Sequence, residues 1–527
     1  MTRAAFRFTA AGLLVAAGVS AQNEPERSIE EIVVTAQRKE EVVRDVPISI
    51  SVLSGDFLKQ QSVTDLGDVA RYVPNLRIVE QGSVVQSWIR GFGTDAFNFG
   101  FDQAVGIVVD EIPYGRSQYL QAGFLDVERV EVLRGPQGQL FGRNTTVGLF
   151  NLTTANPTDE LTGFLDVDGG ELDRLHAEAA IGGPLIPGVM NVRVAGLFDR
   201  RDGYMRNTTA AIVPRADDPL QSRERKGGRI KLAFPDVMGG ELLVSYERAE
   251  MEIEGFAREL TIVPAKFRPL FLLFDPNTDF EPDNYVSSLD APSFRNSTID
   301  TFVAKDRREL GGWALDTLVG WSRLDTKSNL DTDGSPFLDL NYGLDELGEQ
   351  TTFELRVTSP TLAGLLGLPG LGDLPLGESD FTAGIFFQRR VQDPAVNRLH
   401  VNDAVVGTIL ALNAVPDDAG DLLGDLPLPS GSPPDLSAFD ERLTIRGTQK
   451  ANSIAGFGQM DWRFAEPWHL LYGMRLSYSS KRADFQATID PETAVVIPAA
   501  AEEFAAGGSH DELHFTPKVG VKYDWSD

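Results

Sequence analysis

Two arginines occupy the same local context, and the chemistry that they offer is ion pairing. Arg90 and Arg134 each follow an apolar stretch and precede a glycine. A guanidinium group buried at such a position needs carboxylate partners, because an unpaired buried charge is strongly destabilising. We therefore expect both side chains to lie in a contact between two packed parts of the protein.

Catalytic, metal and nucleic-acid chemistry have little support in the sequence. The chain has 0 cysteines, and its 5 histidines do not show the spacing of a metal site. The stretch Asp331–Gly334 resembles part of a calcium loop, but its glycine comes too early for an EF-hand. A formal charge of −29 disfavours binding to phosphate backbones. We expect no enzyme, no resident metal or cofactor and no nucleic-acid partner.

A predicted strand and a glycine-rich turn surround Arg134. Apolar and charged residues alternate over 127–134, which indicates a short β-strand, and a Gly-Pro pair ends it. A phosphate-binding loop is the alternative, but neither the Gly-x-x-x-x-Gly-Lys-Ser/Thr spacing nor a long following helix is present. The residues that define this stretch are Arg129, Glu131, Gly135, Pro136, Gly138 and Gly142.

The whole stretch resembles the end of the plug domain of TonB-dependent outer-membrane receptors. Two earlier motifs match as well, Ile-Arg-Gly ending at Gly91 and Val-Val-Asp ending at Asp110. The chain departs from the family at Glu111, where glycine is usual, and over 145–151, where the family is richer in glycine. These departures could stiffen the turn.

The resemblance implies a membrane β-barrel of about 22 strands around an N-terminal mixed α/β plug. It also implies that Arg90 and Arg134 hold the plug against the wall by pairing with carboxylates on late barrel strands. Those strands are missing from the sequence, which supplies about twelve candidates. We therefore interpret the chain as the N-terminal part of a longer receptor.

The N-terminus predicts export. Basic residues precede an apolar run over 8–19, and a small-residue cleavage site ends at Ala21. This run is shorter than the roughly 20 residues that a membrane-spanning helix needs, which favours a signal peptide over 1–21.

A short β-prone segment follows in the polar region 22–42 and has no obvious local partner strand. It resembles the TonB box, which a TonB-type periplasmic energy-transducing protein captures by strand addition. The box residues are Glu31, Ile32, Val33, Val34, Thr35 and Ala36.

Residues 43–156 have the length of a compact domain and a mixture of expected strands and helices, and they form the predicted plug. Its expected strands cover 47–52, 85–90, 105–109, 127–134 and 149–153, and its expected helices cover 55–61 and 64–72.

Residues 157–527 predict a partial barrel of strands near the ~10-residue length of membrane β-strands. Leu470–Ser479 shows the clearest alternation of apolar and polar residues. Aromatic residues suit the lipid–water interfaces: Trp313, Trp321, Tyr478 and Trp525. Short turns alternate with longer segments at 251–294, 326–348, 392–447 and 486–510. One long connection, 361–378, falls on the side of the short turns. The sequence Leu-Gly-Asp-Leu-Pro-Leu occurs within this connection, at 371–376, and again at 423–428.

The predicted function is energised import of a scarce solute across the bacterial outer membrane by a monomeric multi-pass barrel in contact with lipid and lipopolysaccharide. A ferric siderophore is the favoured substrate within the family. Cobalamin, carbohydrate or aromatic compounds remain alternatives, as does a truncated, nonfunctional receptor. A passive porin or an outer-membrane enzyme are the rival classes.

Overall fold

The computed structural model describes most of the chain between Val33 and Asp524. The described residues are 33–35, 38, 41–81, 84–94, 102–120, 123–211, 219–257, 259, 262–331, 334–336, 341–359, 378–402, 440–465, 467–489 and 503–524. The predicted signal peptide, box residues Glu31, Ile32 and Ala36, Trp525 and both copies of the repeat lie outside them.

A five-stranded sheet in the order β3-β9-β10-β7-β8 forms the centre of the N-terminal region. Its strands are β3 (Ser49–Ser54), β7 (Val105–Val109), β8 (Ile112–Tyr114), β9 (Val127–Arg134) and β10 (Gly148–Thr154). β9 runs antiparallel to both β3 and β10, while β10 runs parallel to β7. These strands supply much of the buried apolar core. The sheet therefore gives β9, with its alternating apolar and charged residues, a central place.

Smaller elements complete this region. A three-stranded sheet contains β4 (Leu76–Gln81), β5 (Val84–Ile89) and β6 (Phe92–Gly93). The helices are α1 (Gly55–Gln60), α2 (Leu66–Val69) and α3 (Gly138–Phe141), with single 3₁₀ turns η1 (Val43–Asp45) and η2 (Ser117–Leu120). Ser54 caps α1 and Asp65 caps α2 by accepting hydrogen bonds from backbone N–H groups. Local sequence patterns did not predict β4, β6, β8 and α3.

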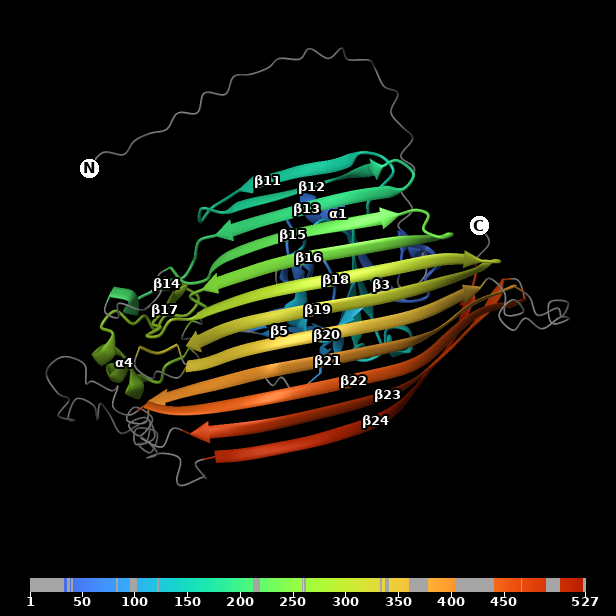
Figure 1. The fold of residues 1–527 in the computed structure, drawn as a ribbon. Coiled ribbons are helices and arrows are strands. Elements are labelled where there is room, and N and C mark those ends of the chain that lie inside the picture. The colour runs from blue at the N-terminus through green and yellow to red at the C-terminus, as the bar shows by residue number, and fades with distance from the viewer. Residues whose placement is uncertain are drawn as a thin grey trace, which may run out of the picture.

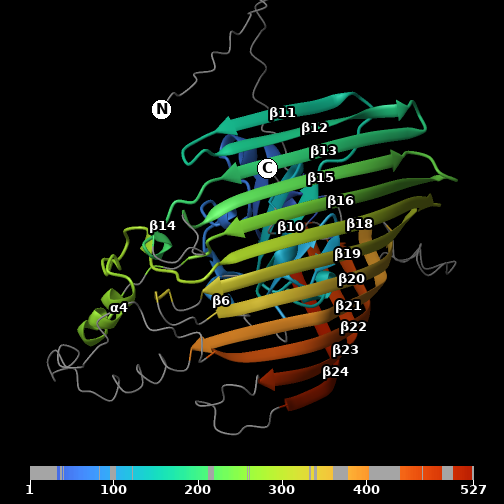
Figure 2. The same ribbon diagram turned by 60° about the vertical axis from the view of Figure 1, so that its left-hand side comes forward.

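Twelve antiparallel strands form a single curved wall around this region (Figures 1 and 2). Each strand pairs with its neighbours in chain order. Their bounds are β11 (Thr162–Gly169), β12 (Leu175–Ile186), β13 (Met190–Arg201), β15 (Ser222–Phe234), β16 (Gly240–Glu254), β18 (Phe294–Leu310), β19 (Trp313–Asp331), β20 (Asn341–Ser359), β21 (Glu378–Asn402), β22 (Asp440–Ala465), β23 (Trp468–Ile489) and β24 (Glu503–Tyr523). Among the described residues, no strand of the N-terminal region joins this sheet.

Short turns separate β12 from β13, β15 from β16 and β18 from β19, and longer connections follow β13 and β16. The long connection from Ser359 to Glu378 joins β20 and β21 at the end of the short turns, as the sequence predicts. The connections after β13 and β16 lie at the opposite end of the wall, and their described residues form small elements (Figure 1). These are β14 (Arg206–Asn207), which pairs in parallel with β17 (Val286–Ser287), the helix α4 (Arg268–Phe274) and the 3₁₀ turns η3 (Thr209–Ala211) and η4 (Ala265–Phe267).

The two faces of the wall differ in chemistry. On β23, Leu476 and Tyr478 are 52% and 47% exposed, while Ser477 and Ser479 are buried. The same alternation places a band of large apolar side chains on the outer face: Val194, Ile230, Tyr246, Phe302, Val319, Trp321, Ile385, Ile454, Met474 and Leu476. An apolar outer face around a polar inner one is the pattern of a membrane barrel wall.

No helix in the described residues is long and apolar enough to cross a membrane.

The wall strands are longer than the sequence analysis expected. β21 and β22 contain 25 and 26 residues, against an expected length near ten. The backbone ladder continues beyond the apolar band, because strand pairing in water does not need an apolar side-chain pattern. The long connections are correspondingly shorter than predicted.

The band of apolar residues on the outer face leads to a prediction about the stability of the protein in lipid. Leu476→Lys should lower the free energy of unfolding in lipid vesicles by about 2–4 kcal/mol, because it places a charge on the lipid-facing surface. Gln486→Lys, on the same face of β23 near its outer end, should have little effect. Urea titration of the vesicle-embedded protein measures both changes. Equal losses in the two variants would contradict a lipid-facing band.

Candidate functional site

The predicted TonB box lies docked against the N-terminal region. Val33 and Val34 form β1, which pairs antiparallel with β2 (Glu41–Val42). The expectation that the box has no local partner is therefore wrong, because the chain turns back on itself within a few residues. Val34 is fully buried in an apolar cluster that includes Leu133 and Phe141.

Thr35 connects the box to the centre of the five-stranded sheet. Its backbone N–H donates to Glu131 Oε1 at 2.9 Å, and its hydroxyl accepts from Asn151 Nδ2 at 3.0 Å. Glu131 is fully buried and also accepts from Asn151 at 2.9 Å and from Arg129 Nε at 2.9 Å. Glu131 and Asn151 are directly opposite in the pairing of β9 with β10, which brings them together. Two of the sequence-selected residues, Arg129 and Glu131, thus hold the box.

Backbone conformation explains two of the selected glycines. Gly135 ends β9 with a φ of 104°, which an L side chain rarely adopts. Gly142 follows α3 with a φ of 78°, and a Cβ there would lie 2.8 Å from the Arg475 guanidinium on β23. The Gly135-Pro136 turn and the α3 start at Gly138 therefore bring the chain into close contact with the wall.

Most of the ion pairs between the N-terminal region and the wall share one polarity. Carboxylates come mainly from the N-terminal region, and Arg or Lys side chains come from the inner face of the wall. The pairs are Asp65 with Arg225 at 2.8 Å, Asp102 with Arg390 at 3.0 Å, Asp110 with Lys231 at 3.1 Å, Glu111 with Arg356 at 2.9 Å, and Asp126 with Arg193 at 2.6 Å. Arg116 with Glu346, at 2.8 Å, has the opposite polarity.

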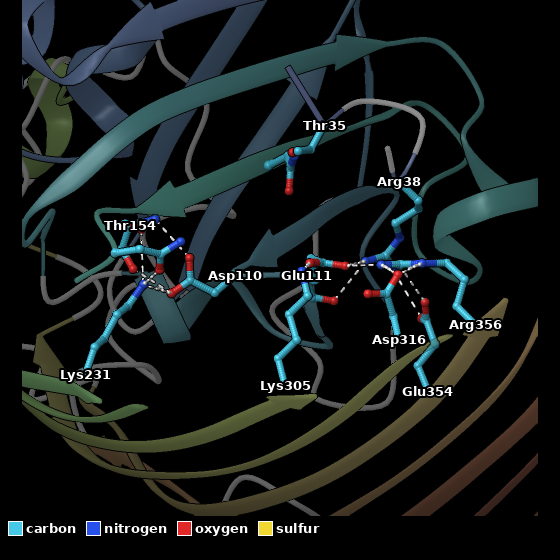
Figure 3. A network of polar contacts seen from close by, with 12 residues as sticks. Thr35, Arg38, Asp110, Glu111, Thr154, Lys231, Lys305, Asp316, Glu354 and Arg356 are labelled. Carbon is cyan, nitrogen blue, oxygen red and sulfur yellow. Dashed lines mark hydrogen bonds and ion pairs between the residues drawn. The ribbon is translucent and has the colours of Figure 1, made fainter. Parts of the chain in front are cut away.

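Asp110 and Glu111 lie side by side in the turn between β7 and β8 and point to different wall cations (Figure 3). Asp110 accepts from the Thr154 backbone N–H at 2.9 Å and pairs with Lys231, which also donates to the Thr154 carbonyl at 3.1 Å. Glu111 pairs with Arg356 and Lys305. Asp110, selected from the plug motif, is therefore an anchoring residue for the wall.

Three of these carboxyl groups have lowered pKa values because cations lie close to them. Burial would raise the pKa of Asp102, but Arg390, Arg143 and Lys481 outweigh it and lower the pKa to about 2. The pKa values of Asp65 and Glu111 are likewise lowered well below their ordinary range, since nearby cations outweigh burial. Asp65, Asp102 and Glu111 are therefore ionised at neutral pH.

Arg90 and Arg134 do not pair with carboxylates in the part of the chain that the structure describes. Arg90 is exposed beside Gly91, and its guanidinium lies 3.4 Å from Ser49 Oγ. Arg134 is half-buried and donates to the Ile50 carbonyl at 3.4 Å. Their pairing with carboxylates of further strands stays a prediction.

Apart from Asp110, sequence reasoning missed the carboxylates that contact the wall. A usable signal exists on β15, where Arg223, Arg225, Arg229 and Lys231 all occupy odd positions and so share one face of the strand. Such a basic inner face predicts acidic partners, although it does not say which ones.

Among the described residues, no group of three or more His, Asp or Glu side chains could hold a metal ion.

Family models match the two regions that the structure separates. The model described as TonB-dependent receptor plug domain matches residues 42–149, and the TonB-dependent receptor-like β-barrel model matches residues 265–527. The chain belongs to the TonB-dependent receptor family, whose members are outer-membrane receptors and transporters rather than enzymes. The N-terminal region is hence the plug, and the twelve-stranded sheet is barrel wall.

Two curated proteins and one solved structure show what the chain is similar to. The pesticin receptor of Yersinia pestis is 27% identical over 226 residues, which cover 43% of this chain and 33% of the receptor. The vitamin B12 transporter BtuB of Vibrio vulnificus is 27% identical over 182 residues, 33% of this chain and 28% of the transporter. The ferric yersiniabactin uptake receptor FyuA from Yersinia pestis has the same fold, with a TM-score of 0.67 at 17% identity, over 91% of this chain and 62% of FyuA. The chain matches about a third of the length of these curated relatives.

The lowered pKa of Asp102 generates a prediction about pH. A carboxyl group with a depressed folded-state pKa stabilises the fold above its ordinary value of about 3.9, and this contribution disappears as the pH falls through the folded value. Docking of the plug around Asp102 should therefore weaken between about pH 4 and pH 2. Hydrogen exchange of residues 102–109, corrected for intrinsic rates, measures this protection.

Asp102→Asn is the matched control. The variant should exchange faster than the wild type at pH 7 and equally fast at pH 2. A difference between the two proteins that persists unchanged at pH 2 would show that the charge of Asp102 does not hold the plug.

Proposed function

We propose that this chain is the plug-bearing part of a receptor that imports an iron chelate, a ferric siderophore first among them, with energy supplied by a TonB-type protein. The observation that carries the proposal is the docked box. Val33–Thr35 is an extended segment at the N-terminal edge of a plug that the wall surrounds, and it is held by a small number of hydrogen bonds. A segment held in this way can be exchanged for pairing with another protein's sheet edge.

The substrate class rests on the relatives. The ferripyoverdine receptor of Pseudomonas aeruginosa, 28% identical over 184 residues, supports an iron chelate, whereas the similarity to a vitamin B12 transporter keeps cobalamin as the second candidate. Uptake of radioactive iron as a ferric siderophore, compared with uptake of labelled cobalamin in the same cells, separates the two.

The presence of a plug argues against the rival class of protein, a passive porin. The core of the plug includes wall residues Val303 and Leu318, so plug and wall pack together. The outer apolar band supports contact with outer-membrane lipid, and we extend this contact to lipopolysaccharide.

The proposal also includes the domain boundaries and the oligomeric state. The plug extends from residue 43 to residue 156, the barrel wall follows after Leu161, and the receptor is a monomer.

The box generates a prediction about transport. Val33→Pro should abolish energised uptake while binding of the solute at the cell surface persists, because proline removes a backbone donor and fixes φ. Val33→Thr, which keeps the donor and the preference for extended backbone, should transport normally. Uptake and surface binding of the same labelled solute are measured in parallel. Equal loss of binding and uptake in the proline variant would count against the box.

A further inference from the structure

A basic cluster between the plug and the wall surrounds a single carboxylate, that of Asp102. Arg390 on β21 pairs with Asp102 at 3.0 Å, and Arg143 of the plug pairs with it at 2.5 Å. Lys481 on β23 lies 3.8 Å from the same carboxylate. Arg143 and Arg390 have no second carboxylate partner among the described residues. One negative charge therefore serves two guanidinium groups, and a third cation lies beside it.

This excess of positive charge distinguishes the cluster from the other large group of ion pairs. The group around Glu111 is balanced, with the cations Arg38, Lys305 and Arg356 and the carboxylates Glu111, Asp316 and Glu354. Glu346, which lies close to Arg390, is itself paired with Arg116 at 2.8 Å. An excess of cations in a confined place attracts a further anion.

The Asp102 cluster lies on the side of the plug that faces the long connections after β13 and β16. Lys481 lies in the half of β23 nearer to Ile489, the end of the wall from which these connections emerge. Lys231, the partner of Asp110, lies near the short-turn end of β15 instead. Long connections mark the extracellular end of an outer-membrane barrel. The side chains of Asp102 and Lys481 are each 22% exposed, so a solute that enters from outside can reach them.

A small cavity adjoins the cluster and contains an unsatisfied polar atom. Its volume is about 20 Å³, room for one water-sized group, and its lining includes Arg390, Arg116 and Gln449. Gln449 is 5% exposed, and its side-chain oxygen accepts no hydrogen bond from the described residues. A buried acceptor without a donor is unfavourable, and a hydroxyl group of a bound molecule would satisfy it.

We infer that Asp102 is an internal counter-ion in the anion site of the solute, and that an iron chelate with carboxylate and hydroxyl groups displaces it. This inference rests on the proposed function and names the chemical class of the chelate. A solute carboxylate forms charge-assisted hydrogen bonds with the guanidinium groups of Arg143 and Arg390. The neighbouring hydroxyl donates to Gln449. Because Asp102 competes for the same cations, it lowers the apparent affinity for the solute.

Displacement of Asp102 gives the plug a means of responding to the solute. Asp102 lies shortly before β7, and β7 leads directly to the turn that contains Asp110 and Glu111. A solute that takes the place of Asp102 removes one ion pair between the plug and β21. Occupation of the site therefore weakens the plug–wall contact on the extracellular side.

Citrate, which carries carboxylates and a hydroxyl group, is the probe for this site. Its binding to the purified protein in detergent micelles is measured by isothermal titration calorimetry. Asp102→Asn should bind citrate roughly tenfold more tightly than the wild type, because the competing carboxylate is gone. Arg390→Gln should bind it about tenfold more weakly, because a charged hydrogen-bond partner is lost.

A second probe isolates the hydroxyl contact. Tricarballylate has the carboxylates of citrate but lacks its hydroxyl group. Gln449→Leu should weaken the binding of citrate and leave that of tricarballylate unchanged, because only citrate donates to the Gln449 oxygen. Equal effects on the two probes would overturn the assignment of the hydroxyl group.

The controls separate the site from general effects of charge and folding. Arg398→Gln and Asp345→Asn break an exposed ion pair of 2.8 Å between β21 and β20, and neither should change the affinity for citrate. Asp102→Glu keeps the competing charge and should stay near the wild type. Hydrogen exchange in β9 shows whether the plug stays folded, and Asp102→Ser is the second neutral variant. Equal or weaker binding in folded Asp102→Asn and Asp102→Ser, or unchanged binding in Arg390→Gln, would overturn the inference.

The binding assay contains no energy-transducing protein, so its outcome does not depend on import. Tighter citrate binding by Asp102→Asn without any TonB-dependent uptake of a ferric chelate would uphold the counter-ion and refute the proposed function. Unchanged citrate binding in Asp102→Asn and Arg390→Gln, with TonB-dependent uptake of a ferric chelate, would do the reverse.

Discussion

The cost of burying charge governs how the two parts of this receptor fit together. The plug shares no strand ladder with the wall in the described residues, so side chains must hold it. An isolated buried carboxylate is expensive, and each of the plug carboxylates that contacts the wall meets an Arg or Lys there. Such pairs add little net stability over an apolar contact, but they penalise every misplaced orientation of the plug. The ion pairs therefore fix the position of the plug more than they stabilise its contact with the wall.

Apolar packing between plug and wall accompanies the ion pairs. Wall residues Val303, Leu318, Phe386, Ala455 and Phe457 join the clusters of the plug core. Leu125 and Tyr119 of the plug pack against two further groups of wall residues. Separating an apolar contact exposes surface to water at a cost that scales with its area. Separated ion pairs recover hydration, which offsets much of the lost attraction. The ion-paired part of the contact therefore costs less to separate than an apolar contact of the same area would.

Local patterns predicted the fold far better than they predicted the contacts. Period-2 alternation identified β9 and the lipid-facing side of β23, because each depends on nearest neighbours along the chain. The pair Glu111–Arg356 joins residues separated by 245 positions, and no local pattern connects them. The sequence also singled out Arg129 and Glu131 without indicating that they hold Thr35, since the box reaches them only after folding. Arg90 and Arg134 stay a prediction, because no carboxylate pairs with them among the described residues.

The hairpin of β1 and β2 has a mechanical consequence. Val33 lies opposite Val42, so the chain enters the hairpin and leaves it toward the plug on the same side, and these are its two ends. Tension between these ends opens the hydrogen bonds one after another instead of shearing them together, which requires little force. Once opened, the nine residue steps from Val33 to Val42 extend to at most about 30 Å. The folded hairpin therefore holds chain length that becomes available only after Val34 and Thr35 have left their places on the plug.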